Sequence, residues 1–362
     1  MSNPQASVEQ ALGELVLPEL GCDPVSAGAV RALHVLDERV VLELGLGFPV
    51  ERMRTALESR IRDALAPVLG ERELILKIDG AVVPHLPQND MKALDRVSNV
   101  IAVASGKGGV GKSTTAVNLA LALRDEGARV GVLDADVFGP SVPTMLGVPA
   151  GTRPEIREEQ FFVPVEAYGL DTMSMGFLVD ERSPVVWRGP KASGGLQQLV
   201  NQTLWNQLDY LIVDLPPGTG DIQLTLAQRV PLAGAVIVTT PQDIALQDAR
   251  KGIEMFHKVD VTVLGIVENM AVHVCSNCGH AEHIFGQGGG EAIAADYEAP
   301  LLGSLPLSLS IREQADGGHP TVAAAPESTE AGLYRDAARH LVGRLSLRPA
   351  GERAFPRVVT EA

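Results

Sequence analysis

The strongest constraint on the fold is a glycine- and lysine-rich segment at residues 106–112, which follows an apolar run at 101–104 and precedes a helix-prone stretch from Ser113 to Leu123. The segment holds four glycines and two lysines in seven residues. Its spacing fits G-x-x-x-x-G-K-[ST], in which glycines free backbone N–H groups to surround phosphate oxygens at a helix N-terminus. The order strand, loop, helix favours a nucleotide phosphate site over a merely glycine-rich turn.

The motif assigns roles to its polar side chains. Lys112 is expected to reach the β and γ phosphates, and Ser113 is expected to hold Mg²⁺. Replacing Lys112 by Ala is therefore expected to remove ATP hydrolysis and to leave the fold intact. Lys107, five residues earlier, is expected to point away from its own γ-phosphate and to suit a site in a facing subunit; a solvated loop lysine is the alternative. The predicted nucleotide-binding residues of the loop are Gly106, Gly108, Gly109, Val110, Gly111, Lys112, Ser113 and Thr114.

The whole run K-G-G-V-G-K-S-T-T resembles the deviant Walker A motif of the dimeric SIMIBI-class P-loop ATPases. This class includes the septum-positioning (MinD) and partition (ParA) ATPases, the nitrogenase iron protein and the Mrp/ApbC carriers. The resemblance implies an enzyme that binds and slowly hydrolyses ATP, and a homodimer in which Lys107 and Lys112 are both catalytic.

Composition sets limits on the partners of the chain. The 362 residues are 45% hydrophobic and 21% charged, which is typical of a soluble protein large enough for two domains. No signal peptide or long apolar run is evident, so a cytoplasmic location without a membrane partner is expected. The net charge of −15 lacks the electrostatic footprint of a nonspecific nucleic-acid binder, so no nucleic-acid partner is expected.

Residues 1–80 predict a small α+β domain. Helical spacing at Val8–Glu19 and Pro49–Leu69 alternates with β-rich runs at Val30–Leu36, Arg39–Leu46 and Leu74–Ile78. This α-β-β-α-β order resembles the small iron–sulfur-assembly domain often fused ahead of Mrp-type ATPases.

One departure from that domain concerns metal binding. The cysteine that the family usually has at the start of the second helix is missing, and the region reads Gly45-Leu-Gly-Phe-Pro-Val. Cys22 is an alternative ligand, although a lone cysteine is more often a small packing residue.

The remaining residues divide into three segments. Residues 81–97 are rich in proline and polar residues and predict an exposed linker that lets the small domain move. Residues 98–345 predict the ATPase domain, and residues 346–362 predict a disordered tail.

Strands and helices alternate along residues 98–345, which predicts a doubly wound, mostly parallel α/β sheet. After the strand at 101–104, the other predicted strands are Arg129–Leu133, Leu208–Val213, Gly234–Thr240 and Val261–Val267. Ligands of such sheets bind at the carboxyl ends of the strands, where polar residues are therefore of interest.

Three carboxylates and one amide follow these strands. An apolar strand ending in Asp214 is a Walker B pattern, whose carboxylate meets Mg²⁺ directly or through water. The resemblance implies that Asp136 polarises the attacking water, that Asp134 belongs to the Mg²⁺ shell and that Asn269 reads adenine. Turn-capping roles for the aspartates and for Asn269 are the alternatives.

Two further segments narrow the family. Residues 184–190 (Pro-Val-Val-Trp-Arg-Gly-Pro) and 218–226 resemble stretches specific to Mrp carriers. Val274-Cys-Ser-Asn-Cys-Gly-His and the following His283-Ile-Phe-Gly-Gln-Gly-Gly-Gly match the carriers' C-x-x-C-G and H-x-F-G-x-G-G-G pattern, which the septum and partition ATPases lack. On these residues the chain resembles an Mrp/ApbC-type iron–sulfur cluster carrier ATPase.

The Cys275-x-x-Cys278 pair bears on the metal and on the oligomer. A [4Fe–4S] cluster takes four thiolates, and the chain has no second cysteine pair. A twofold dimer would bring two pairs together, and the same axis would face Lys107 across to the other nucleotide. The alternative is zinc within one chain, completed by His273, His280 or His283.

The resemblance implies a carrier that holds a labile cluster at a dimer interface and transfers it to apo iron–sulfur proteins, with a scaffold protein as a further partner. Two other functions stay open. The first is a MinD/ParA-like spatial organiser, disfavoured by the cysteine pair, the acidic charge and a tail interrupted by Pro349 and Pro356. The second is an ATP-driven iron–sulfur reductase, which would cycle electrons through its cluster.

Overall fold

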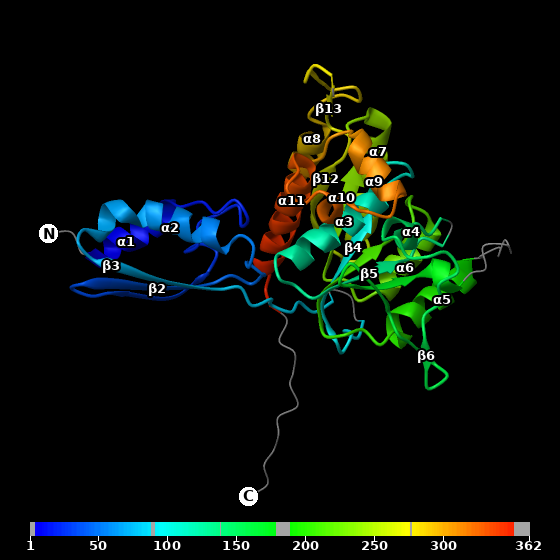
Figure 1. Cartoon of the computed structure of the whole chain (residues 1–362), viewed down its shortest axis with the longest axis horizontal. Coiled ribbons are helices and arrows are strands. Elements are labelled where there is room, and N and C mark those ends of the chain that lie inside the picture. Colours follow the sequence, from blue (N-terminus) through cyan, green and yellow to red (C-terminus); the bar gives the residue numbers. More distant parts are fainter. Residues whose placement is uncertain (1–3, 88–90, 138, 179–188, 276, 351–362) are drawn as a thin grey trace, which may run out of the picture.

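The computed structural model describes residues 4–87, 91–137, 139–178, 189–275 and 277–350. A small N-terminal α+β domain stands beside a larger α/β domain (Figure 1). None of the helices in the described part of the chain combines the length and the apolar composition needed to cross a membrane. Most of the carrier-like segment at 184–190 lies outside the described residues.

The small domain has the predicted element order. It comprises α1 (Pro4–Glu14), β1 (Val30–Val35), β2 (Arg39–Gly45), α2 (Arg54–Leu69) and β3 (Glu73–Asp79). Strand β2 is central, antiparallel to β1 and parallel to β3. Its apolar core includes Leu12 of α1, Leu42 of β2 and Ile61 of α2, which are all fully buried.

The first helix ends earlier than the predicted Val8–Glu19. Helix α1 stops at Glu14, because the chain then bends so that the N–H of Leu17 donates to the carbonyl of Cys22 at 3.0 Å. Pro18 follows directly and cannot contribute an N–H to a helix. Cys22 packs against the small domain's core, as expected for a packing residue.

The large domain is built on one sheet, in which the described residues form eight strands in the order β15-β12-β11-β4-β10-β5-β9-β8. All neighbours are parallel apart from β8 and β9, so the predicted doubly wound, mostly parallel sheet is confirmed. The strands are β4 (Val97–Ala104), β5 (Val130–Asp134), β8 (Val165–Ala167), β9 (Leu170–Ser174), β10 (Leu208–Asp214), β11 (Gly234–Thr239), β12 (Val263–Glu268) and β15 (Leu301–Ser304).

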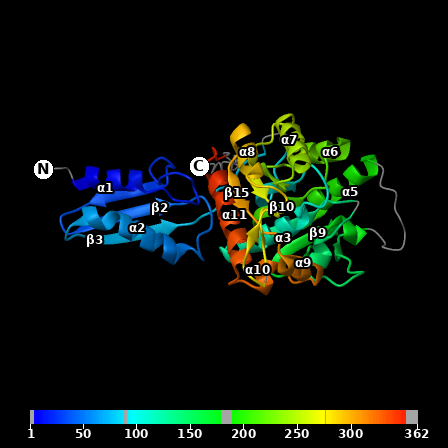
Figure 2. The same ribbon diagram turned by 90° about the horizontal axis from the view of Figure 1, so that it is seen from above.

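Helices cover both faces of this sheet (Figure 2). Alternate residues of β4 enter different cores: Ile101 packs in the core that holds α3 (Lys112–Asp125) and α11 (Thr329–Ser346). Ala102 packs in the core that holds α5 (Gly189–Gln202), α6 (Asp221–Arg229) and α7 (Asp243–His257). The shorter elements are α4 (Val142–Met145), β6 (Ile156–Arg157), β7 (Phe161–Phe162), a 3₁₀ helix (Met175–Leu178), β13 (His273–Val274), β14 (Ala281–Glu282), α8 (Gly289–Asp296), α9 (Leu309–Asp316) and α10 (Thr321–Ala324).

The predicted linker and tail are more firmly packed than expected. His85 is buried, its backbone N–H donates to Asn99 Oδ1 at 3.0 Å, and its Nδ1 lies 3.0 Å from the same oxygen. Its Nε2 lies 3.3 Å from the carbonyl of Arg348, whose guanidinium in turn donates to the carbonyl of Ala233. The expectations of an exposed linker at His85 and of disorder from residue 346 are therefore wrong for these residues, whereas 351–362 lie outside the described chain.

Candidate functional site

The glycine-rich loop between β4 and α3 has a backbone that only glycine allows at two points. Gly109 and Gly111 have φ angles of 81° and 82°, in the left-handed region. A Cβ on Gly111 would lie 2.1 Å from Asn269 Nδ2, and a Cβ on Gly106 would lie 2.2 Å from the Asp248 carbonyl of α7. The loop is therefore held closely between α7 and the end of β12.

Helix α3 begins at Lys112, directly after Gly111 as its N-cap. The N–H and hydroxyl of Thr115 both bond the Gly111 carbonyl, at 3.0 and 2.9 Å. The N-terminal end of a helix dipole favours negative charge, so the start of α3 suits a phosphate group.

Lys112 and Asp214 form a buried ion pair at the base of the loop. Their side chains are only 6% and 0% exposed. Lys112 Nζ also lies 3.2 Å from Ser113 Oγ, and Ser113 donates to the Asp214 carboxylate. Burial raises the pKa of Asp214 while the charge of Lys112 opposes that rise. The second carboxylate oxygen, Oδ2, is buried and has no hydrogen-bonding partner within the described chain.

Asp134 lies beside Asp214, because the two residues pair in register at the ends of parallel strands. Its Oδ1 accepts from the backbone N–H of Asp136 at 3.1 Å, and its Oδ2 accepts from that of Val142 at 3.1 Å and from Ser174 Oγ at 3.0 Å. Burial, followed by the charge of Asp214, raises the pKa of Asp134 to about 7. Asp134 thus holds the backbone of the loop after β5.

Ser174 was not found from the sequence. It ends β9, a strand that the sequence pattern did not reveal, so nothing marked its hydroxyl as a partner of Asp134.

Three loops meet around a cavity of about 170 Å³ at this edge of the sheet. The P-loop, the loop after β5 with Asp136, and Pro217 after β10 all line it. This volume is below that of typical small-molecule pockets, so the cavity matches the phosphate end of a nucleotide. The predicted residues that line it are Lys107, Gly108, Gly109, Gly111, Lys112, Ser113, Thr114 and Asp136.

Lys107 is half-buried and engaged within its own chain. Its Nζ lies 3.4 Å from Oε1 of Gln242, the N-cap of α7, and its carbonyl accepts from Ser105 Oγ at 2.8 Å. Gln242 was also missed, since a side-chain contact between residues 135 positions apart leaves no local pattern. Whether Lys107 serves a facing subunit stays a prediction.

Asn269 supports the P-loop in this structure. Its Nδ2 donates to the carbonyl of Val110 at 2.9 Å, and its Oδ1 accepts from the N–H of Met270 at 2.9 Å. Adenine recognition by Asn269 stays a prediction.

The donors around Asp214 fit Mg²⁺. This ion prefers carboxylate, hydroxyl and water oxygens. The unpartnered Oδ2 of Asp214 and the nearby hydroxyl of Ser113 supply two such oxygens beside the phosphate cavity.

Cys275 and Cys278 lie in the turn of the β13–β14 hairpin, which projects from the large domain (Figure 1). The hairpin is closed by hydrogen bonds from Cys275 N to His280 O at 2.9 Å and from Gly279 N to Cys275 O at 2.8 Å. Backbone N–H groups of Asn277 and Cys278 donate to the Cys275 thiol and lower its pKa. Cys275 is half-buried and Cys278 is exposed, so both thiols are accessible to a ligand, and the lowered pKa of Cys275 favours its thiolate form.

The neighbouring histidines are partly engaged. His283 Nδ1 lies 2.8 Å from the carbonyl of Ala271, and His273 Nδ1 lies 3.2 Å from that of Leu307. Among the residues that the structure describes, no three of the His, Cys, Asp and Glu side chains are grouped to hold one metal ion.

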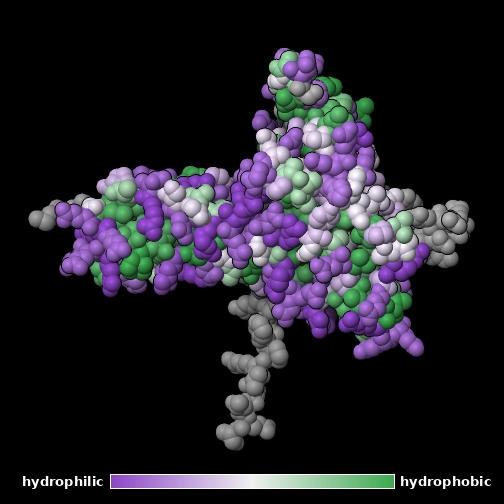
Figure 3. Space-filling model, in the orientation of Figure 1, coloured by the Kyte–Doolittle hydropathy of each residue, from purple (hydrophilic) through white to green (hydrophobic). Residues whose placement is uncertain are grey.

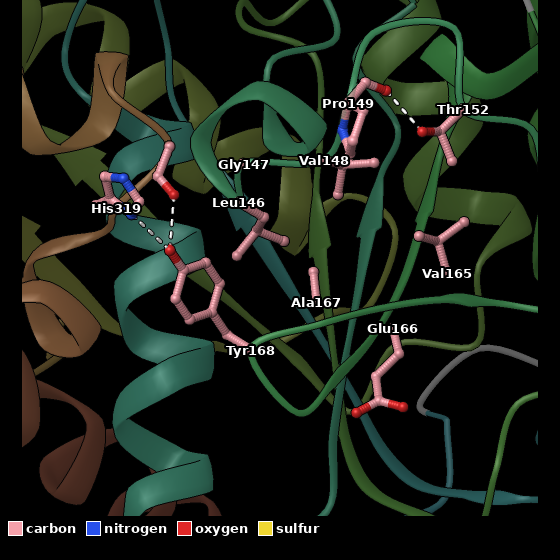
Figure 4. A pocket seen from close by; sticks show the side chains of 11 residues that line it. Leu146, Gly147, Val148, Pro149, Thr152, Val165, Glu166, Ala167, Tyr168 and His319 are labelled. Atoms are coloured by element: carbon pink, nitrogen blue, oxygen red, sulfur yellow. Dashed lines mark hydrogen bonds between the residues drawn. The ribbon is translucent and has the colours of Figure 1, made fainter.

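A roomier cavity of about 360 Å³ lies beyond α4, away from the phosphate loop. Figure 4 shows the Tyr168 hydroxyl pointing to the Gly318 carbonyl, 2.8 Å away, and to Nδ1 of His319, 2.9 Å away. The apolar part of the cavity wall includes Leu146, Val148 and Pro149. No residue of the predicted site lines this cavity, so its size does not make it the site of the nucleotide chemistry.

Known protein families match the small domain and the large domain separately. The family of NUBPL iron-transfer P-loop NTPases matches residues 96–342, and the iron–sulfur cluster assembly protein family matches residues 5–74. The iron–sulfur cluster carrier protein of Escherichia coli is 48% identical over 94% of this chain and 92% of its own. The carrier protein of Pseudomonas fragi is 61% identical over 76% of this chain and 96% of its own. Mouse NUBPL, an iron–sulfur cluster transfer protein, is 52% identical over 71% of this chain and 81% of its own.

Solved structures agree with this placement. A nucleotide-binding protein from Archaeoglobus fulgidus in complex with ADP has a TM-score of 0.57 and 36% identity, over 66% of this chain and 92% of its own. The cell division ATPase MinD of Pyrococcus furiosus, at 23% identity and a TM-score of 0.53 over 67% of this chain and 98% of its own, shares the fold. The family match covers more than half of the chain, and the chain therefore belongs to the family of NUBPL-type iron-transfer P-loop NTPases.

Proposed function

We propose that this protein is an ATP-hydrolysing carrier that holds an iron–sulfur cluster between two copies of the chain and transfers it to apo-proteins. The observation that carries the proposal is the accessible Cys275–Cys278 pair, with a lowered thiol pKa at Cys275, on a P-loop NTPase of this family. Relatives that align over most of their length are named iron–sulfur cluster carrier or transfer proteins.

The nucleotide is bound by the loop and by the start of α3. Mg²⁺, held by Ser113 and Asp214, would neutralise charge on the phosphates. Lys112 is expected to turn from Asp214 to the β and γ phosphates, because both lie at the same edge of the cavity. Asp136 lines that cavity and is expected to orient the attacking water. Asp134 keeps the loop of Asp136 in place through the N–H groups of Asp136 and Val142.

The cluster is the cargo, and its ligands explain why a dimer is needed. One chain offers two thiolates in the hairpin, whereas a [4Fe–4S] cluster takes four. Two hairpins related by a twofold axis together supply four thiolates. Zinc bound by one hairpin is the competing occupant, with His273, His280 or His283 as further ligands.

The proposal extends to partners and to place in the cell. Client apo-proteins and a scaffold protein are the expected partners, and the cytoplasm is the expected location. The spatial-organiser alternative rests on the shared fold alone, since the MinD structure is only 23% identical. The reductase alternative predicts ATP-dependent electron transfer instead of cluster transfer.

A transfer assay tests the function. The protein is loaded with iron and sulfide without oxygen, then mixed with an apo-enzyme whose activity requires a [4Fe–4S] cluster, in the presence of an iron chelator. Activity should return faster than with free iron and sulfide, and Cys278→Ser should abolish the effect. Equal activation by wild type and Cys278→Ser would mean that the hairpin does not carry the cargo.

A further inference from the structure

A second polar cavity, of about 280 Å³, lies between the small domain and α11. We name it the seam cavity. Arg52 and Arg60 line it from the small domain, and Arg335 and Arg339 line it from α11. Glu19 and Asp336 are the acidic residues of its lining. Four guanidinium groups thus share one cavity, and three of them already pair with carboxylates: Arg52 with Glu327 at 2.7 Å, Arg60 with Glu19 at 3.1 Å, and Arg339 with Glu126.

Arg335 is the most buried of these arginines, with 8% of its surface exposed. Its Nη1 donates to the carbonyl of Pro326 at 2.6 Å, and its Nε and Nη2 make no hydrogen bond to another described residue. Burial is the largest cause that lowers the pKa of Arg335, and the charges of Arg52 and Arg339 lower it further, whereas those of Glu327 and Asp125 raise it. Because the pKa is lowered on balance, these two carboxylates do not fully compensate the buried cation, which favours the binding of a further anion.

Arg339 differs from Arg335 because carboxylates accept hydrogen bonds from its side chain. Its Nε donates to Glu126 Oε1 at 2.8 Å, and its Nη1 donates to Asp336 at 3.2 Å. Arg60, by contrast, uses only Nη1, which contacts both oxygens of Glu19 at 3.2 and 3.1 Å. Unused donors therefore come to the seam cavity from both domains, from Arg60 of α2 and from Arg335 of α11.

We propose that the seam cavity binds a small anion that bridges Arg60 and Arg335. Planar guanidinium groups pair in two-pronged fashion with phosphate and with carboxylate, so the ligand is a compact phosphoryl or carboxylate compound. The face drawn in Figure 3 is largely hydrophilic where the small domain meets the large one. This site goes beyond cluster transport and shares no residue with the phosphate cavity around Lys112.

A bound anion would also link the small domain to the nucleotide domain. Arg339 of the same cavity binds Glu126, which caps α3 at the end opposite the P-loop and accepts from the N–H of Met53 at 3.2 Å. The ligand would therefore add contacts across an interface that already reaches α3.

The test is calorimetric titration of the full chain, first with inorganic phosphate and then with malonate. Saturating Mg·ADP keeps the P-loop occupied in both. We expect one saturable site per chain. Arg60→Gln and Arg335→Gln should each weaken binding about tenfold or more, because each removes a charge-assisted hydrogen bond. Binding of phosphate alone would identify a phosphoryl ligand, and binding of both anions a site that accepts either group.

Matched controls lie on the same two helices. Arg344 is exposed on α11, and Arg62 on α2 donates to the Leu74 carbonyl; neither lines the seam cavity. Arg344→Gln and Arg62→Gln should bind like the wild type, and circular dichroism melts verify folding of every variant. If Arg335→Gln fails to fold, Arg60→Gln decides, because Arg60 is partly exposed. Absence of saturable binding, or equal weakening by the controls, would overturn the proposal.

Discussion

The buried ion pair between Lys112 and Asp214 makes the nucleotide-free protein depend on Lys112 for stability as well as for catalysis. The expectation from the sequence was that Lys112→Ala leaves the fold intact. Because Asp214 is fully buried and Lys112 is its cationic partner, removing Lys112 leaves an uncompensated carboxylate in the core. We therefore predict that Lys112→Met, which keeps the length of the side chain, both abolishes hydrolysis and destabilises the nucleotide-free protein.

The size of the effect follows from the burial. Breaking a buried ion pair from one side costs about 3–5 kcal/mol. In a domain of this size each kcal/mol shifts the melting temperature by about 2–4 °C, so a loss of roughly 6–20 °C is expected.

The effect should also depend on pH. Burial already raises the pKa of Asp214 in the folded state, and without Lys112 that pKa rises further. A group with a raised folded pKa contributes its full stability below its unfolded pKa and loses it as the pH rises through the folded value. The deficit of Lys112→Met should therefore be smaller at about pH 5 than at about pH 8, because pH 5 lies only about one unit above the unfolded pKa of about 3.9 and each unit corresponds to about 1.4 kcal/mol.

Urea denaturation of the nucleotide-free protein at these two pH values measures the effect. Lys112→Met with Asp214→Asn should recover about 2 kcal/mol or more relative to Lys112→Met, because the double variant buries no charge there. Lys107→Met is the control, since Lys107 is only half-buried and contacts a neutral amide. A deficit below about 1 kcal/mol at the higher pH, or no recovery in the double variant, would refute the reasoning.

Three more predictions concern the loop, the facing subunit and the hairpin. Gly111→Ala should cost about 1–2 kcal/mol from its left-handed backbone alone and lose nucleotide affinity, as titration with a fluorescent ADP analogue would show; normal affinity would contradict the described loop. Lys107→Ala and Asp136→Asn should each be inactive, and their mixture should regain ATP turnover at one site per mixed dimer; mixed dimers without activity would mean that Lys107 does not act across the interface. Cys275→Ser or Cys278→Ser should remove the cluster's visible absorbance and weaken dimerisation in sedimentation, because each change removes two of four ligands; an unchanged dimer with intact absorbance would exclude bridging.

Much of the nucleotide site could be predicted because its residues lie in short, contiguous sequence patterns. The strand, glycine loop and helix around Lys112 are contiguous, and Asp134 and Asp214 directly end apolar strands. The alternation of strands with helices then requires these ends to meet at one edge of the sheet. The structure brings Asp134 and Asp214 together there, in register.

The rest depends on contacts between distant residues. Strand β9 is a five-residue strand between β5 and β8 with a mixed pattern, Leu-Asp-Thr-Met-Ser, so neither it nor the Ser174 bond to Asp134 could be expected. The linker looked exposed because it is polar and rich in proline, but His85 is buried through a bond to Asn99 on β4. The Lys112–Asp214 pair joins residues 102 positions apart, and only the folded sheet places it in the core.

The central claim, that two copies of this chain share one cluster through Cys275 and Cys278, is tested most directly by composition. Protein purified without oxygen is analysed for iron, acid-labile sulfide and zinc, and its mass is determined by light scattering in the same sample. The account predicts a dimer with about four iron and four sulfide per two chains, the content of one [4Fe–4S] cluster. A monomer with one zinc ion per chain and no sulfide would contradict it.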